Sequence, residues 1–479
     1  MIMKEKLTSG IAWVMFATLA SKMLAVVAQV VLGYYLAIEN FGIYATALGM
    51  TAVFSWMKNG SILQLIIREA VAGAGAGGST GKFFKFANGF NVVSSFGLFG
   101  LAYLYWDDAN YIGFLMLSFA IAQLFSLPQI KIRSSCSASG RFKALGYYEL
   151  GQSLLNNLTV VFFAILLGDE RCFAFSILAI TLYDIVIHSF YFKSKISKER
   201  FDFNAFRQVW LNGKWLLLGA IGSSMAMQGV FLVIGLWETD ITLGLYFFAF
   251  QLVSVFAVIV GEAVRKVLMP VLSSIENEDD RFGSLNRVLK YCSLFVIPIS
   301  FGSVIGIGPA MDVIWSGKWA GAIVAAELMT ATLFMPILVL LCYSYYEASG
   351  FWRLRNVVQV LDGVFLLIAV GVGSVLGGLT LIAICAVLRR LFFCLFLLHY
   401  TYKKGSKKLE VELFQHLLGV GVVSSATVLV GVSCLDFFDA GNAIRIFTSI
   451  FVIAISIFIL LAWKYPHDLQ ELVKRLKVN

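Results

Sequence analysis

The chain has 479 residues, of which 59% are hydrophobic and 14% are charged, and its mean hydropathy is +0.85. This composition excludes a soluble globular protein, because such proteins carry about 25% charged residues. The net charge of +9 does not indicate nucleic-acid binding, since basic residues gathered in short loops between apolar segments are what membrane orientation produces. We therefore expect an all-α polytopic membrane protein surrounded by a lipid bilayer.

The first apolar segment, residues 11–37, is long enough to cross a bilayer and carries one charge, Lys22. A lysine at that depth costs about 2.5–3.5 kcal/mol, so it should face the helix bundle or a wet cavity rather than lipid. Its small and polar residues recur at helical spacing, which places them on one stripe. The stripe consists of Thr18, Lys22, Ala25, Gln29 and Gly33. Lys22 and Gln29 are therefore candidate cavity residues.

This segment and its continuation recur 202 residues later without a gap. Trp13 matches Trp215, and the FGIY turn around Gly42 matches the LGLY turn around Gly244. The tripeptide Ala-Ser-Gly at 138–140 also recurs at 348–350, each time after an apolar span that contains a proline. Self-similarity in fixed register is the signature of an internal repeat. The chain is therefore expected to contain two homologous halves.

Apolar runs between polar breaks predict about fourteen transmembrane helices. The expected organisation is a first six-helix lobe at 1–193, a basic cytoplasmic linker at 194–210, a second six-helix lobe at 211–402, and two additional helices with a cytoplasmic tail at 403–479. The predicted spans are 11–37, 41–57, 84–106, 111–132, 144–168, 172–193, 211–237, 241–264, 288–310, 320–345, 356–377, 379–402, 412–434 and 442–463.

The loop charges predict the orientation of these spans. Of the 37 Lys and Arg residues, 31 fall at the N-terminus, in or beside the loops after even-numbered spans, and in the C-terminal tail. Three, Arg171, Lys318 and Arg445, fall in the opposite loops, which are otherwise acidic. Short cytoplasmic loops carry the excess of basic residues. Both termini are therefore expected in the cytoplasm.

Polar residues inside the spans mark either a transport path or helix packing. Glu149, Gln152 and Asn156 share one stripe of the fifth span, and Gln359 and Asp362 share one stripe of the repeat-related eleventh span. Two matching polar faces, one in each half, favour a shared central cavity. Packing alone is the alternative interpretation.

Two further pairs of residues are candidates. Arg389 and Arg390 lie about ten residues into the twelfth span, either near the bilayer midplane or at the cytoplasmic end of a shorter helix. Asp184 and His188 are one helical turn apart in the sixth span. They could form a pair that titrates near neutral pH and couples transport to protons, or they could serve only as interhelical hydrogen-bonding groups.

No catalytic or cofactor motif is recognisable in the sequence. The seven cysteines are scattered without metal-ligand or redox spacing, and there is no P-loop, HExxH, GxSxG or EF-hand pattern. We therefore expect neither an enzyme nor a bound metal or cofactor. Transport would draw on an ion gradient or on the concentration difference of the substrate.

Several segments resemble a known family. They are SGIAW, LAIENFGIYA, NGSILQLIIRE and ASGRFKALGYYE in the first half, and LGLYFFA and WSGKWAGA in the second. Over nearly the whole chain they are similar to the polysaccharide-transporter branch, the Wzx-type flippases, of the multidrug/oligosaccharidyl-lipid/polysaccharide (MOP) exporter superfamily. The resemblance implies two six-helix lobes around a V-shaped cavity, alternating access, and two added C-terminal helices.

The same resemblance implies a function. Members of the branch flip undecaprenyl-pyrophosphate-linked oligosaccharides across the bacterial cytoplasmic membrane, for O-antigen, capsule or exopolysaccharide assembly, with a polysaccharide polymerase as an expected partner. Lys22 and the two arginines of span twelve could supply cations for the pyrophosphate. A multidrug cation exporter of the superfamily, a lipid II flippase and a non-transporting membrane scaffold are the alternatives.

Overall fold

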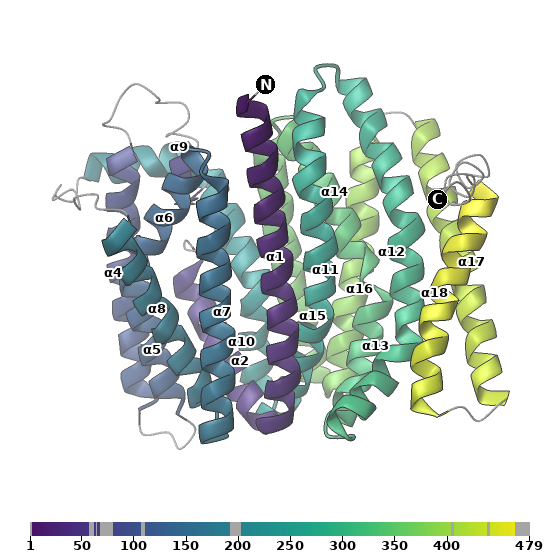
Figure 1. Cartoon of the computed structure of the whole chain (residues 1–479), viewed down its shortest axis with the longest axis horizontal. Helices are drawn as coiled ribbons and strands as arrows, with labels where there is room; N and C mark the ends of the chain where they lie inside the picture. Colours follow the sequence, from purple (N-terminus) through teal and green to yellow (C-terminus); the bar gives the residue numbers. More distant parts are fainter. Residues whose placement is uncertain are drawn as a thin grey trace. The chain divides into compact units, whose positions relative to one another are not determined.

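A computed structural model of the chain is helical throughout the described part, and no strand occurs in it (Figure 1). The predicted linker at 194–210 is described only from residue 203, and the predicted tail beyond residue 464 lies outside the described residues. The structure describes residues 2–56, 62–63, 65–67, 80–106, 111–191, 203–403, 407–437 and 441–464.

Each of the fourteen predicted spans corresponds to one helix or to consecutive helices, which confirms the fold class. In the described part of the chain, ten helices are long and apolar enough to cross a membrane, and twelve spans result if each of two bent helix pairs counts as one. The remaining two predicted spans correspond to α2 (Ile38–Ser55) and α4 (Thr80–Leu104). Helix α4 contains polar residues such as Asn91 and Ser95, and both of these side chains are buried.

The chain divides into two compact units. The first comprises residues 1–247 and 352–375, and the second comprises residues 248–351 and 376–479. Besides α2, α4 and the start of α11 (Asp240–Ser274), the first unit holds α1 (Ile2–Tyr35), α5 (Ile112–Leu124), α6 (Leu127–Ala138), α7 (Phe142–Leu167), α8 (Arg171–Tyr191), α9 (Phe203–Ser224), the π-helix η1 (Met225–Gly229), α10 (Val230–Trp237) and α15 (Trp352–Leu376).

The second unit packs around a long helix, α12 (Glu278–Trp315). Glycines let the last helix, α18 (Asn442–Lys464), approach it closely. A Cβ on Gly302 would lie 2.3 Å from Ile453, and a Cβ on Gly306 would lie 2.5 Å from Ser449. The other helices of this unit are the rest of α11, η2 (Ala320–Ala322), α13 (Ile323–Ala331), α14 (Phe334–Ala348), α16 (Leu379–Lys403) and α17 (Lys407–Phe437).

The internal repeat is visible in the two bent helix pairs. The pair α5–α6 bends by 46° and the pair α13–α14 by 41°, and each pair ends at a glycine with positive φ, Gly140 at 65° and Gly350 at 77°. Such glycines commonly end helices, because a left-handed backbone is unstrained only without a Cβ. Corresponding spans of the two halves therefore share a break and a cap. The exact lobe boundaries at 193 and 402 stay a prediction.

Glycines on α7 set the distances between the helices that surround the site. A Cβ on Gly146 would lie 2.8 Å from the ring of Trp13 on α1, and a Cβ on Gly151 would lie 2.4 Å from the hydroxyl of Tyr183 on α8. Large aromatic side chains thus occupy the space that these glycines leave. The polar face of α7 is consequently held between α1 and α8.

Candidate functional site

A cavity of about 580 Å³ lies inside the first unit. Helices α1, α5, α6, α7 and α8 surround it, and most of its lining side chains carry a hydroxyl, an amide or a charge. Its polar lining consists of Thr18, Ser21, Lys22, Gln129, Arg133, Glu149, Gln152, Ser153, Asn156, Asn157, Thr181 and Asp184. A volume of this size is within the usual range of small-molecule sites, about 300–1,000 Å³.

Five of the residues predicted from the sequence line this cavity, namely Lys22, Glu149, Gln152, Asn156 and Asp184. Within the described residues, Lys22 makes no hydrogen bond or ion pair, although Glu149 lines the same cavity. The cation of Lys22 is thus half-buried in a polar cavity and is not neutralised by a carboxylate of the described part of the chain. A ligand that enters this cavity meets it directly.

A chain of hydrogen bonds crosses one wall of the cavity. Nη2 of Arg133 donates to Oε1 of Gln152 at 3.2 Å, and Nε2 of Gln152 donates to the two carboxylate oxygens of Asp184 at 3.0 and 3.2 Å. The Tyr148 hydroxyl donates to Oδ1 of Asp184 at 2.6 Å. These partners fix the orientation of the Gln152 amide, because its oxygen faces a cation and its nitrogen faces an anion. The chain joins α6, α7 and α8.

Sequence reasoning missed Arg133, Gln129 and Tyr148. The fourth span was expected to end at 132, so Arg133 was counted with the cytoplasmic loop. In the structure, α6 starts at Leu127 with Pro128 in its first turn and continues to Ala138, and this places Arg133 in the cavity wall. The four-residue spacing of Gln129 and Arg133 was the available signal, since residues i and i+4 share a helix face.

Two predicted residues on the cavity helices do not line it. Gln29 lies two turns beyond Lys22 on α1, and its buried Nε2 has no hydrogen-bond partner in the described structure. His188 lies one turn beyond Asp184 on α8, and its buried Nε2 likewise has none there. The hydrogen-bond partners of Asp184 include Tyr148 and Gln152. The role of Asp184 and His188 in proton coupling stays a prediction.

The candidates of the second half lie elsewhere. Gln359 and Asp362 belong to α15 in the first unit, but they do not line this cavity. Oε1 of Gln359 is buried without a hydrogen-bond partner in the described part of the chain. A role of this face in transport stays a prediction.

Arg389 and Arg390 lie in the middle of α16, which is one continuous helix in the second unit. Nη1 of Arg390 is 3.5 Å from the Met329 carbonyl oxygen and from Oγ1 of Thr332. Met329 and Thr332 lie where α13 ends and the bent pair breaks, so Arg390 contacts one carbonyl oxygen and one hydroxyl group at this break. The depth of the two arginines in the bilayer stays a prediction.

The cavity can bind a polar ligand that carries a negative charge. Lys22 and Arg133 supply cations, Glu149 supplies an acceptor, and the serine, threonine and amide side chains match hydroxyl groups, which both donate and accept hydrogen bonds. The fold and this cavity together define a polytopic helical membrane protein with a polar, partly charged binding site.

The particular family follows from the sequence. A family described as "Polysaccharide biosynthesis protein" matches residues 31–324, more than half of the chain. The chain belongs to this family. A sequence comparison with curated proteins gives no match.

Solved structures show the same fold. The chain is similar to a lipid II flippase, MurJ, in an inward closed conformation, with a TM-score of 0.72, 16% identity, and coverage of 93% of this chain and 98% of MurJ. It is similar to an inward-facing multidrug MATE transporter of the MOP superfamily with a TM-score of 0.62, 11% identity, and coverage of 82% and 96%. This family and this fold agree with the resemblance to the polysaccharide-transporter branch that the sequence segments indicate.

Proposed function

We propose that this protein flips undecaprenyl-pyrophosphate-linked oligosaccharides across the bacterial cytoplasmic membrane by alternating access, with both termini in the cytoplasm. The family, polysaccharide biosynthesis, and the flippase and exporter fold support a transporter of this general kind. The resemblance supports the lipid-linked substrate and supply of O-antigen, capsule or exopolysaccharide assembly. The polymerase of that assembly is the expected partner.

The observation that carries this proposal is the composition of the cavity. A sugar presents hydroxyl groups, and a pyrophosphate presents oxygens with negative charge. The hydroxyl and amide side chains suit the sugar, and the cation of Lys22, which has no ion-pair partner among the described residues, suits the phosphate oxygens. An ammonium in a partly dehydrated cavity attracts an anion more strongly than one in water, because the effective dielectric constant is lower.

The carboxylates of the cavity are the feature that a multidrug exporter would need, since such exporters move organic cations. Asp184, however, accepts hydrogen bonds from Tyr148 and Gln152. Its ligand-binding capacity is therefore partly used within the protein. Glu149 lines the cavity without a hydrogen bond or ion pair to the described residues. It can accept from a sugar hydroxyl as well as from a drug cation.

Deletion of the gene tests the proposal directly. We expect loss of surface polysaccharide, growth at a normal rate, and unchanged resistance to cationic drugs and dyes, with recovery on expression of the intact protein. Drug hypersensitivity with normal polysaccharide would favour the multidrug exporter, and lethality with arrested peptidoglycan synthesis would favour the lipid II flippase. Recovery by a Lys22→Ala variant that inserts normally would show that export does not need the Lys22 cation.

A further inference from the structure

Helix α6 carries a second basic residue, Lys131, on the face opposite Arg133. The two residues are two positions apart, which places them about 160° apart around the helix. Arg133 lines the cavity and Lys131 does not. Nζ of Lys131 instead lies 5.7 Å from the centre of the Phe84 ring on α4. Such a contact attracts the cation weakly and leaves its charge in place. Lys131 therefore presents a positive charge outside the cavity, between α6 and α4.

The imidazole of His188, on α8, lies near this charge. Helix α6 packs on both α4 and α8, and the charge of Lys131 acts on the His188 ring. Nε2 of His188 is buried and has no hydrogen-bond partner among the residues that the structure describes. Lys131 likewise makes no hydrogen bond or ion pair to these residues. Two basic side chains thus lie together, and no acceptor from the described part of the chain satisfies them.

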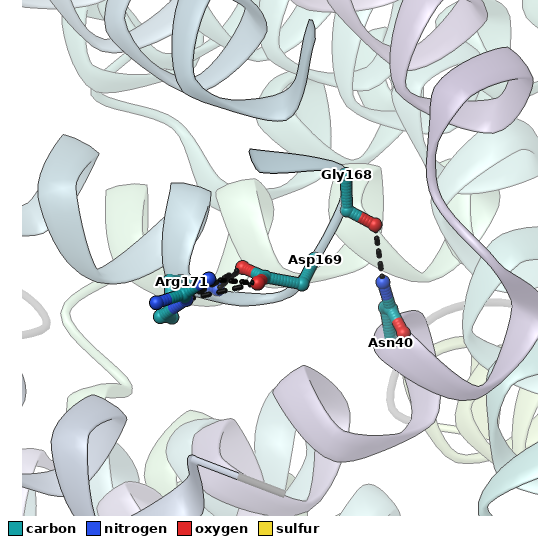
Figure 2. A network of polar contacts seen from close by, with 4 residues as sticks. All are labelled: Asn40, Gly168, Asp169 and Arg171. Atoms are coloured by element: carbon teal, nitrogen blue, oxygen red, sulfur yellow. Dashed lines mark hydrogen bonds and ion pairs between the residues drawn. The ribbon is translucent and has the colours of Figure 1, made fainter. Parts of the chain in front are cut away.

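Several basic residues elsewhere have carboxylate partners. At the opposite end of α8, Nε of Arg171 donates to Oδ2 of Asp169 at 2.9 Å, and Figure 2 shows this pair. In the second unit, Nη2 of Arg265 lies 3.5 Å from Oε2 of Glu347. Two basic groups that lie together without such a partner repel each other when both are protonated, and an anion between them relieves the repulsion.

The pair opens toward the predicted cytoplasmic side. Ser135 and Ser139 follow Lys131 at four-residue intervals, so they share its side of α6, and both are exposed. Helix α4 begins, and α6 and α8 end, at loops that the charge distribution predicts to lie inside. Lys131 lies seven residues before the end of α6 at Ala138, about 10 Å at 1.5 Å per residue. A flexible lysine side chain at this depth can reach the phosphate layer of the inner leaflet.

We propose that Lys131 and His188 bind the phosphate group of an anionic phospholipid of the inner leaflet, at a site separate from the transport cavity. Lys131 supplies the cation, and Nε2 of His188 donates a hydrogen bond to a phosphate oxygen. Lys82 and Lys85, in the first two turns of α4, add positive charge at the same end. Basic pockets between membrane helices on the cytoplasmic side bind such headgroups. The bound lipid joins α4, α6 and α8, and it thereby supports the helix that holds Arg133 in the cavity wall.

Lipid titration of the purified protein tests this site. Native mass spectrometry measures the binding of phosphatidylglycerol, which is anionic, and of phosphatidylethanolamine, which is zwitterionic. We expect wild type to bind phosphatidylglycerol more tightly. Lys131→Gln and His188→Phe should each bind it about tenfold more weakly, as for the loss of one hydrogen bond to a charged group.

Lys143→Gln is the matched control, because Lys143 is an exposed lysine on the same predicted side, and this variant should bind like wild type. Equal binding of the two lipids by wild type, or equal binding of phosphatidylglycerol by wild type, Lys131→Gln and His188→Phe, would overturn the proposal.

Lys131→Arg separates loss of charge from loss of fold, since it keeps the cation and should retain tight binding. Weak binding by a Lys131→Arg protein that melts like wild type would overturn the role of the charge. Phosphatidylglycerol should also raise the melting temperature of wild type, because a ligand that binds only the folded state stabilises it. It should raise that of Lys131→Gln less, and an equal rise would count against the site.

Two competing probes distinguish the source of the phosphate group. Inorganic phosphate and farnesyl diphosphate are each added against bound phosphatidylglycerol, and we expect neither to displace it at equal concentration. Displacement by inorganic phosphate would assign the site to a soluble anion, and displacement by farnesyl diphosphate would assign it to an isoprenoid carrier; either result overturns the phospholipid. None of these measurements needs transport, so they stand apart from a failure of the proposed function.

Discussion

The Tyr148 hydroxyl lies 2.6 Å from Oδ1 of Asp184, and this hydrogen bond joins α7 to α8. Both residues are buried, and each is only 5% exposed. A buried carboxylate that loses a donor is left with an unsatisfied acceptor, which costs about 1–3 kcal/mol. The contact is therefore expected to contribute to stability as well as to the shape of the cavity.

Replacing this hydroxyl should destabilise the protein. We expect Tyr148→Phe to lower the free energy of unfolding by about 1–3 kcal/mol, seen as a lower melting temperature of the purified protein in detergent. Tyr147→Phe is the matched control, because Tyr147 is the neighbouring residue and is 61% exposed. Equal melting temperatures for the two variants would contradict a structural role for the bond.

The charge of Lys22 should be needed for transport. Lys22→Ala removes the cation that meets the substrate anion, and a charge-assisted hydrogen bond of about 1.5–3 kcal/mol corresponds to a loss of tenfold or more in transport. Lys22→Arg keeps the charge and should retain part of the activity. The measurement is surface polysaccharide in the complemented deletion strain, with membrane levels of each variant checked. Normal polysaccharide with Lys22→Ala, or failure of that variant to accumulate, would count against the anion-binding role.

The proton-coupling hypothesis makes a separate prediction. If Asp184 or His188 carries the coupled proton, Asp184→Asn and His188→Ala should change how export depends on pH between 6 and 8. If both variants export normally over that range, the two residues are structural. Gln152→Leu removes an amide that is hydrogen-bonded to Asp184, and it distinguishes a structural role of Asp184 from a role in proton coupling. If the role is structural, this variant should be less stable, and the pH dependence of export by the folded protein should not change.

Orientation in the membrane can be tested through the predicted linker. Ser197→Cys, in a variant without native cysteines, should not react with an impermeant reagent in intact cells and should react after permeabilisation. Asp439→Cys, in a loop predicted to lie outside, is the control and should react in both. The expectation comes from the 31 basic residues that gather on the predicted inner side. Reaction at position 197 in intact cells would reverse the assigned orientation.

Glu170, in the connection between α7 and α8, predicts a pH dependence of stability. Burial raises the pKa of its carboxyl, and the nearby carboxylates of Asp169 and Asp240 raise the pKa further. The folded protein thus binds this proton more tightly than the unfolded chain, so the free energy of unfolding decreases as pH rises above about 4.3 and through the raised pKa.

Glu170→Gln removes the buried charge. We expect a higher melting temperature than wild type at pH 7 and no difference near pH 4, where the wild-type carboxyl is protonated. Thermal melting in detergent between pH 4 and 8 measures the effect. The exposed Glu276 supplies the control variant Glu276→Gln, which should follow wild type at every pH. A Glu170→Gln protein that melts lower at pH 7 would show that the carboxylate is held favourably.

Much of the architecture follows from local properties of the sequence. The apolar runs predicted where the helices lie, because a bilayer requires about 20 apolar residues per helix. In the described part of the chain, ten of these helices, or twelve spans with each bent pair counted as one, are long and apolar enough to cross a membrane. The repeated turn around Gly42 and Gly244 and the repeated Ala-Ser-Gly caps predicted two related halves, and the structure shows the shared break and cap at Gly140 and Gly350. The polar stripes of α1 and α7 also followed from helical spacing, and they meet in one cavity.

The partners of each polar residue depended on the tertiary structure. Spacing placed Asp184 next to His188 on one helix, but its hydrogen bonds to Tyr148 and Gln152 come from another helix. Arg133 lines the cavity because α6 continues past the expected end of its span. Arg390 contacts a helix break whose position no local sequence pattern predicted. Helical periodicity fixes which face of a helix is polar, whereas the neighbour that meets this face is set by close packing at residues such as Gly146 and Gly151, between positions far apart in the sequence.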